Sequence, residues 1–233
     1  NDIFYIASNK SSLLKESNKS RAKKIMQKSN ITTAEYFTTA PGEHKNKKSL
    51  PILFPLFIKP ITGGDSRGID KNSIVHNYLN YKKKVLEIKK NQHSRCLVEK
   101  YLSGKEYSVG IFKNNITGLI ETMPIEIIVK KNINGNHILD FNIKKNDEEE
   151  VIAVLDIKIF NQLSILAKKS FIALKGKSFG RIDFKMDNLG NLCFMEANLM
   201  PGIGKGYFYR SCLLNLNINY EEMILKITAN GLH

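Results

Sequence analysis

The chain has 233 residues, of which 42% are hydrophobic, so it can bury a sizeable core as one large domain or as two lobes. Its formal net charge of +14 comes from lysines in short, scattered runs, which argues against a nucleic-acid-binding protein and fits the attraction of anionic small molecules. No apolar run approaches the roughly 20 residues that cross a bilayer, and the first residues lack the pattern of a signal peptide, so we expect no membrane association and a cytoplasmic protein.

The first half of the chain is predicted to alternate helices and strands. Residues 18–29 have the apolar spacing of a helix that starts at an Asn or Ser. Residues 50–60 form an apolar run that ends in Lys-Pro, as in a buried strand, and a Gly-rich loop, "ITGGDSRGI", follows. Helical periodicity then covers residues 73–90, and "CLVEKYL" at 96–102 is predicted to be a strand.

The second half is predicted to be mainly antiparallel strands. Residues 104–115 and 116–128 alternate as a pair, and residues 133–150 suggest a hairpin that passes into a charged loop. The clearest helix is 157–174, with apolar residues at i, i+3, i+4 and i+7. A hairpin at 179–202 and a closing helix at 220–232 complete the order. Because no βαβ repeat appears, the pattern predicts an α+β fold with layered antiparallel sheets.

Cysteine usage adds no metal or disulfide site. The three cysteines are scattered along the chain without CxxC spacing, which gives neither a zinc motif nor a disulfide framework. We therefore expect a buried thiol at each of Cys96, Cys193 and Cys212.

The hairpin "FGRIDFKMDNLGNLCFMEANLMPG" carries an unusual set of polar side chains. Strict alternation places Arg181, Asp183 and Lys185 on one face of its first strand. In the second strand, alternation predicts one face made of Asn191, Cys193 and Met195, and an opposite face made of Leu192, Phe194, Glu196 and Asn198.

Two interpretations of this hairpin stay open on spacing alone. Antiparallel strands commonly have one solvated, charged face that serves no chemistry. Alternatively, Asp183, Glu196 and Asn198 supply hard oxygen donors in a small volume, which suits Mg²⁺. Arg181 beside them could hold developing negative charge.

The Gly-rich loop is a second candidate site. Lys59 precedes Gly63, Gly64 and Gly68, whose backbone N–H groups can surround phosphate oxygens while Ser66 adds a hydroxyl. The loop matches neither the Walker motif nor the dinucleotide fingerprint, and an ordinary exposed turn is the alternative.

A third candidate is the strand edge in "VEKYLSGKEYSV". Its backbone groups could face an adenine ring and Glu106 could hold ribose hydroxyls. By itself, such a segment is more often only a surface strand.

Taken in order, these segments resemble the ATP-grasp superfamily, most closely the D-alanine:D-alanine ligases. "FIKP" with "GGDSRGI" looks like the strand and small phosphate loop of that family, "LVEKYLSGKEYSV" like its adenine-binding edge, and the hairpin like its metal and catalytic hairpin. The resemblance implies two α+β lobes that grip ATP between antiparallel sheets, with most of the N-terminal domain absent. We expect a remnant or linker at 1–17, a small lobe at 18–97 and a large lobe at 98–233.

The resemblance also implies roles for individual residues. It implies ATP binding by Lys19, Lys59, Gly64, Ser66, Glu99, Lys100, Leu102, Glu106 and Lys144. It implies that two Mg²⁺ ions, with Mn²⁺ as an alternative, are held by Asp183, Glu196 and Asn198. Stabilisation of the acyl transition state is implied for Arg181 and the Gly202 N–H.

The implied reaction is amide-bond formation through an acyl phosphate, with a carboxylate and an amine, such as amino acids, as substrates. The sequence departs from the family pattern at Asp65, at Lys145 and in "PGIGKGYFYRS", so the use of D-alanine stays open, and Lys205 or Arg210 is a candidate for binding a substrate carboxylate. The alternatives are an ATP-grasp ligase for another amino acid and a non-catalytic nucleotide-binding fragment. Related ligases are often dimers, so a homodimer also stays open.

Overall fold

The computed structural model describes residues 5–64, 66–130, 139, 143 and 146–231. Its helices are α1 (Lys10–Glu16), α2 (Lys19–Lys28), α3 (Tyr78–Gln92), α5 (Ile157–Ala173), α6 (Tyr207–Leu216) and α7 (Tyr220–Gly231). Its strands are β1 (Tyr36–Thr39), β2 (Leu56–Pro60), β3 (Ile74–Val75), β4 (Cys96–Lys100), β5 (Glu106–Lys113), β6 (Ile120–Ile128), β7 (Glu150–Ala153), β8 (Phe179–Met186) and β9 (Leu192–Asn198).

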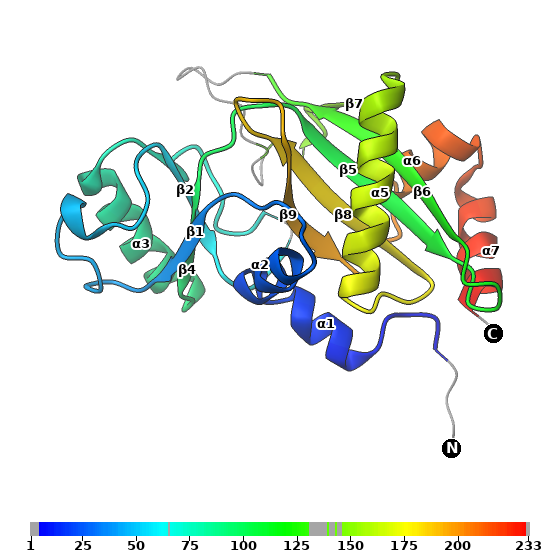
Figure 1. Cartoon of the computed structure of the whole chain (residues 1–233), viewed down its shortest axis with the longest axis horizontal. Helices are drawn as coiled ribbons and strands as arrows, with labels where there is room; N and C mark the ends of the chain where they lie inside the picture. Colours follow the sequence, from blue (N-terminus) through cyan, green and yellow to red (C-terminus); the bar gives the residue numbers. More distant parts are fainter. Residues whose placement is uncertain (1–4, 65, 131–138, 140–142, 144–145, 232–233) are drawn as a thin grey trace.

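The strands form two antiparallel sheets that lie next to each other (Figure 1). The first has the order β1-β4-β2-β3, and α3 packs against it. The second has the order β7-β6-β5-β8-β9, with α5 on one face and α6 on the other. This arrangement confirms the predicted α+β class with layered antiparallel sheets.

The second sheet is covered on both faces, and β5 at its centre is buried almost throughout. Val109 and Ile111 point into the core beneath α5, while Phe112 points into the core beneath α6. Gly110 allows α6 to approach, because a Cβ atom there would lie 2.9 Å from the Cβ atom of Ser211. The strands of this sheet are therefore held rigidly at the positions from which polar residues project.

The first sheet has its own core, in which Ile58 of β2 and Val98 of β4 pack with Val85 and Ile88 of α3. The expected lobe boundary between residues 97 and 98 falls inside β4, the strand that pairs with both β1 and β2. The chain passes from one sheet to the other between Lys100 and Glu106.

Most predicted elements are present, although several boundaries were wrong. The helix predicted for 73–90 begins at Tyr78, because the Asn77 side chain accepts the Asn80 N–H and caps it there, and β3 precedes it. In the run predicted as a strand at 50–60, only Leu56–Pro60 is a strand, since Pro51 and Pro55 lack an N–H to donate to a ladder.

Among the described residues, the elements that were not predicted are α1, β1, a 3-10 helix at Lys47–Ser49, β3, most of β7 and α6. The hairpin predicted for 133–150 lies mostly outside the described residues. Its last residue, Glu150, begins β7, which pairs with β6.

Strict alternation in the last hairpin was wrong for its second strand. Asp183 pairs with Glu196, but the next residue along β8, Phe184, pairs with Phe194, so Met195 is an extra residue in β9. Such a bulge reverses the side-chain alternation at that point. Consequently Phe194 lies in the core while Glu196 lies opposite Asp183, and the two do not share a face.

Two other expectations concerned the cysteines and membrane-spanning helices. The cysteines at 96, 193 and 212 are free and buried, as predicted. Within the part of the chain that the structure describes, no helix has both the length and the apolar character needed to cross a membrane.

Candidate active site

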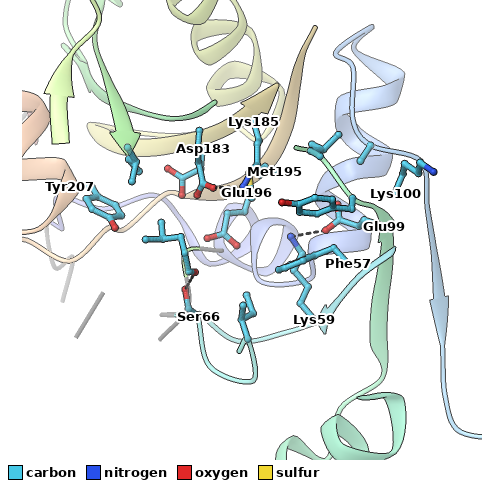
Figure 2. Close-up of a pocket in the computed structure, with 17 residues that line it drawn as sticks. Phe57, Lys59, Ser66, Glu99, Lys100, Asp183, Lys185, Met195, Glu196 and Tyr207 are labelled. Carbon is cyan, nitrogen blue, oxygen red and sulfur yellow. Dashed lines mark hydrogen bonds and ion pairs between the residues drawn. The ribbon is translucent and has the colours of Figure 1, made fainter. Parts of the chain in front are cut away.

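A cavity between the two sheets collects most of the predicted ATP-binding residues (Figure 2). The first sheet and the chain after it contribute Lys59, Glu99, Lys100 and Leu102, and the loop after β2 contributes Ser66. The second sheet contributes Glu106, Asp183, Lys185 and Glu196. Residues predicted from separate motifs thus face one space, and each sheet contributes both lysines and carboxylates to it.

Glu99 is the most deeply buried carboxylate of this cavity and lies between two lysines. Its oxygens are 2.5 Å from Lys23 Nζ and 2.7 Å from Lys59 Nζ, and neither lysine is more than 2% exposed. Burial alone would raise the pKa of Glu99, but the two ammonium groups outweigh it and hold that pKa at about 2. The pKa of Lys59 is raised because Glu99 and Glu196 outweigh its burial. The cavity wall therefore carries fixed charges.

Lys23 was not predicted as a site residue. Besides its ion pair with Glu99 of β4, it donates a hydrogen bond of 3.2 Å to the Phe194 carbonyl of β9. It therefore connects α2 to both sheets. Its position four residues after Lys19, on the same helix face, was the available signal.

Lys19 does not line the cavity, but it fixes the Gly-rich loop. Its Nζ donates to the Gly63 carbonyl at 2.5 Å, and burial lowers its pKa. Gly63 and Gly68 have φ of +95° and +78°, which favours glycine, while the Cβ position of Gly64 is open. Gly64 lies in this loop outside the cavity lining, and Ser66 donates to the Leu139 carbonyl at 3.4 Å.

The predicted adenine and ribose residues are held by local contacts. Lys100 donates to the carbonyls of Leu53 and Phe54, both at 3.2 Å. Glu106 accepts from Lys185 at 2.9 Å. Lys144, together with Asp65 and Lys145, lies outside the described residues.

A second cavity adjoins the first and contains the predicted catalytic residues. Arg181, Asn198, Gly202, Lys205 and Arg210 line it, and Glu196 and Tyr207 line both cavities. Arg181 makes two hydrogen bonds to Asp183, from Nε at 3.0 Å and from Nη2 at 2.9 Å. Asp183 also accepts from Ser108 Oγ at 2.6 Å.

The predicted metal ligands lie in register on neighbouring strands. Asp183 pairs with Glu196 and Arg181 pairs with Asn198, so the three oxygen-bearing side chains occupy one corner of the sheet. The Asn198 Nδ2 atom is buried and has no hydrogen-bond partner among the described residues. Two carboxylates and an amide oxygen fit Mg²⁺. Among the described residues, no cluster of three His, Cys, Asp or Glu provides another metal site.

Glu16 of α1 was also missed, because α1 itself was not predicted. Its Oε2 atom accepts the Leu199 N–H at 2.5 Å, next to the end of β9. Burial, assisted by the nearby Glu196 carboxylate, raises the pKa of Glu16 to about 7.

Two antiparallel sheets that enclose charged residues from both sides define a protein of the ATP-grasp class. The chain belongs to the family described as "D-ala D-ala ligase C-terminus", whose sequence model matches residues 25–229. The resemblance stated from the motifs is therefore confirmed.

Individual relatives agree with this assignment. The D-alanine–D-alanine ligase of Streptococcus uberis is 26% identical over 232 residues, and that of Streptococcus agalactiae is 28% identical over 196 residues. These matches cover 97% and 82% of this chain, but 64% and 53% of the relatives. The chain thus spans between about half and just under two thirds of the length of these relatives.

Solved structures confirm the fold. The D-alanine–D-alanine ligase of Bacillus anthracis complexed with ATP has a TM-score of 0.77 at 21% identity, covering 99% of this chain and 70% of that one. The VanG D-Ala:D-Ser ligase of Enterococcus faecalis has a TM-score of 0.76 at 17% identity, covering 97% and 64%.

Proposed function

We propose that this chain forms the ATP-binding and catalytic part of a carboxylate–amine ligase similar to the D-alanine:D-alanine ligases. The observation that carries the proposal is the cavity in which Lys59 of the first sheet faces the same space as Asp183 and Glu196 of the second (Figure 2). Such an arrangement suits a polyphosphate, because cations and a metal-binding carboxylate pair are available on opposite walls.

In the proposed reaction, a substrate carboxylate oxygen attacks the γ-phosphorus of ATP, the bond to the β-phosphate breaks, and ADP leaves. A neutral amine then attacks the acyl phosphate, phosphate leaves with the carbon–oxygen electron pair, and the amine loses a proton as the amide forms. Lys59 binds phosphate oxygens, and the loop with Gly64 and Ser66 covers them. Arg181 and the Gly202 N–H stabilise the negative charge that develops on the acyl group.

The remaining assignments belong to the same proposal. Glu99, Lys100 and Leu102 line the adenine end of the cavity, Glu106 holds the ribose, and Lys19 and Lys144 act on the phosphates. Asp183, Glu196 and Asn198 hold Mg²⁺, which neutralises phosphate charge when bound. The sheet carrying Lys59 acts as the small lobe and the sheet carrying Glu196 as the large lobe. Because the three cysteines are free, we place the reaction in the reducing cytoplasm.

A second candidate is an ATP-grasp ligase that joins a different amino acid. It is favoured by Lys205 and Arg210 on the second cavity, where Arg210 is ion-paired with Asp147. Replacing Lys205 or Arg210 separately by Met should raise KM for one amino substrate alone. An unchanged KM in both variants would mean that neither Lys205 nor Arg210 binds a substrate carboxylate.

The proposal is tested by measuring ADP release with Mg²⁺ and ATP across a panel of D- and L-amino acids, with Glu196→Gln as the blank. Turnover with D-alanine supports the first candidate, and turnover with another amino acid supports the second. Tight Mg²⁺-dependent ATP binding without turnover on any amino acid would leave a nucleotide-binding unit and contradict the ligase assignment for this chain.

A further inference from the structure

Glu16, the last residue of α1, is hydrogen-bonded to the backbone that follows β9. Helices α1 and α2 both lie against β9 (Figure 1). The Oε2 atom of Glu16 accepts the Leu199 N–H at 2.5 Å, and Leu199 is fully buried. A buried N–H is costly to leave without an acceptor. Glu16 therefore fixes the Leu199 backbone.

Leu199 lies between two groups that the proposed function places in the site. Asn198, directly before it, is a proposed Mg²⁺ ligand, and Gly202, after it, supplies a proposed transition-state N–H. Both residues line the second cavity. The ladder between β8 and β9 ends at the Arg181–Asn198 pair, so Leu199 is the first residue of this segment that the ladder does not hold. The contact with Glu16 therefore takes over where the sheet stops.

The segment from Glu16 to Lys19 also holds the start of the Gly-rich loop. The Lys19 N–H donates to the Ile61 carbonyl at 2.9 Å, and the Lys19 Nζ atom donates to the Gly63 carbonyl at 2.5 Å. The two ends of this short segment are thus bonded to different parts of the site. One end is fixed to the proposed phosphate loop, and the other end to the backbone beside the proposed metal ligand.

From these contacts we infer that Glu16 is a positioning residue of the metal site. Its bond to Leu199 holds Asn198 in place, and the segment up to Lys19 keeps Asn198 aligned with the Gly-rich loop. The inference rests on the proposed ligase function and on the Mg²⁺ site within it. Removing a group that orients a metal ligand typically lowers metal affinity by about tenfold or more.

Charge is the competing explanation for any effect of Glu16. Burial and, to a smaller extent, the Glu196 carboxylate raise the pKa of Glu16, so the two carboxylates lie within electrostatic reach of each other. An ionised carboxylate there attracts Mg²⁺ whether or not it is bonded to Leu199. The test must therefore change the contact and the charge separately.

Calorimetric titration of the full chain with a non-hydrolysable ATP analogue, in Mg²⁺ and in EDTA, measures the gain in nucleotide affinity that Mg²⁺ provides. Glu16→Gln keeps an acceptor at the same reach without the charge, and should retain this gain to within about twofold. Glu16→Asp keeps the charge but is too short to reach the Leu199 N–H, and should lower the gain by about tenfold. Affinity in EDTA should stay within about twofold of wild type in both variants, because the Lys19 contacts remain.

Ser12→Ala is the control for a purely structural effect of α1. Ser12 is buried on the same helix, and its Oγ atom donates to the Lys175 carbonyl at 2.9 Å, so this variant weakens the attachment of α1 without touching Leu199. It should retain the Mg²⁺ gain to within about twofold. Urea unfolding shows which variants are folded. If Glu16→Asp is not, Glu16→Met, which has no oxygen acceptor, replaces it and is compared with Glu16→Gln at equal charge.

The outcomes separate this inference from the proposed function. A wild type that binds no nucleotide would reject the proposed function, and a wild type without any Mg²⁺ gain would reject the metal site; the inference would fall with either. If wild type shows the gain, its retention in Glu16→Asp, or an equal loss in Glu16→Gln or Ser12→Ala, would overturn the inference alone.

Discussion

Lys23 and Glu99 form a 2.5 Å ion pair in which the lysine side chain is fully buried and the glutamate side chain is 7% exposed. The pair joins α2 to β4, an inner strand of the first sheet, while the same Nζ atom donates to β9 in the second. Such a contact couples the two sheets at the wall of the cavity, so its loss should affect stability as well as binding.

Replacing Lys23 by Met should lower the free energy of unfolding by about 3 kcal/mol, because it removes one partner of a buried ion pair and leaves the Phe194 carbonyl without its donor. Urea unfolding measures the change. Lys24→Met, at the exposed neighbouring position on α2, should stay within about 0.5 kcal/mol of wild type. If both variants lost the same free energy of unfolding, the loss would come from removing any lysine of α2, and the buried ion pair would not explain it.

Replacing Lys59 by Met should weaken binding of a non-hydrolysable ATP analogue by at least about tenfold, because a buried ammonium group is removed from the cavity wall. Glu99 keeps its ion pair with Lys23, so the variant should remain folded. Calorimetric titration gives the dissociation constant. Lys71→Met provides the control, since Lys71 is exposed. An unchanged dissociation constant in Lys59→Met would restrict Lys59 to a structural role.

The sequence predicted the parts of the site that follow strand periodicity or a local motif. Lys59 at a strand end and Asp183 in the last hairpin were found in this way. Lys23 was missed because its partner Glu99 is 76 positions further along the chain, and the spacing from Lys19 indicates only a shared helix face, not that partner. The position of Glu196 relative to Phe194 depended on the bulge at Met195, which simple alternation cannot represent.

Some elements were not predicted because they depend on tertiary contacts. Helix α1 has seven residues and becomes stable only where its Asn9 cap accepts the Ser12 N–H and Ser12 donates to the Lys175 carbonyl. Since Glu16 is placed by α1, its approach to Leu199 could not be foreseen from the sequence either.

Replacing Glu196 by Gln should reduce the gain in nucleotide affinity that Mg²⁺ provides by at least about tenfold, because a charged oxygen ligand is lost from the predicted metal site. The measurement is calorimetric titration of the ATP analogue with Mg²⁺ and with EDTA. Glu121→Gln, which removes a partly exposed carboxylate paired with Lys226, should retain the full Mg²⁺ effect. If Glu196→Gln retained it as well, the metal assignment of Glu196 would be wrong.

The raised pKa of Glu16 makes a prediction about stability and pH. Its pKa is about 7 in the folded protein against an ordinary value of 4.5, so between these values the folded state holds a proton that the unfolded state has released. Stability from this group is therefore complete below about pH 4.5 and is lost as the pH rises through 7. Glu16→Gln keeps an acceptor for the Leu199 N–H and carries no charge, so it should stabilise the protein at pH 8 by about 1–2 kcal/mol.

Urea unfolding of wild type and Glu16→Gln at intervals from pH 5 to pH 8 measures this effect. The two free energies of unfolding should lie close together at pH 5 and separate as the pH rises. Glu221→Gln, at an exposed position in the first turn of α7, should run parallel to wild type over the whole range. If the difference between wild type and Glu16→Gln were constant with pH, Glu16 would be ionised in the folded protein throughout, and its burial beside Glu196 would carry no electrostatic cost.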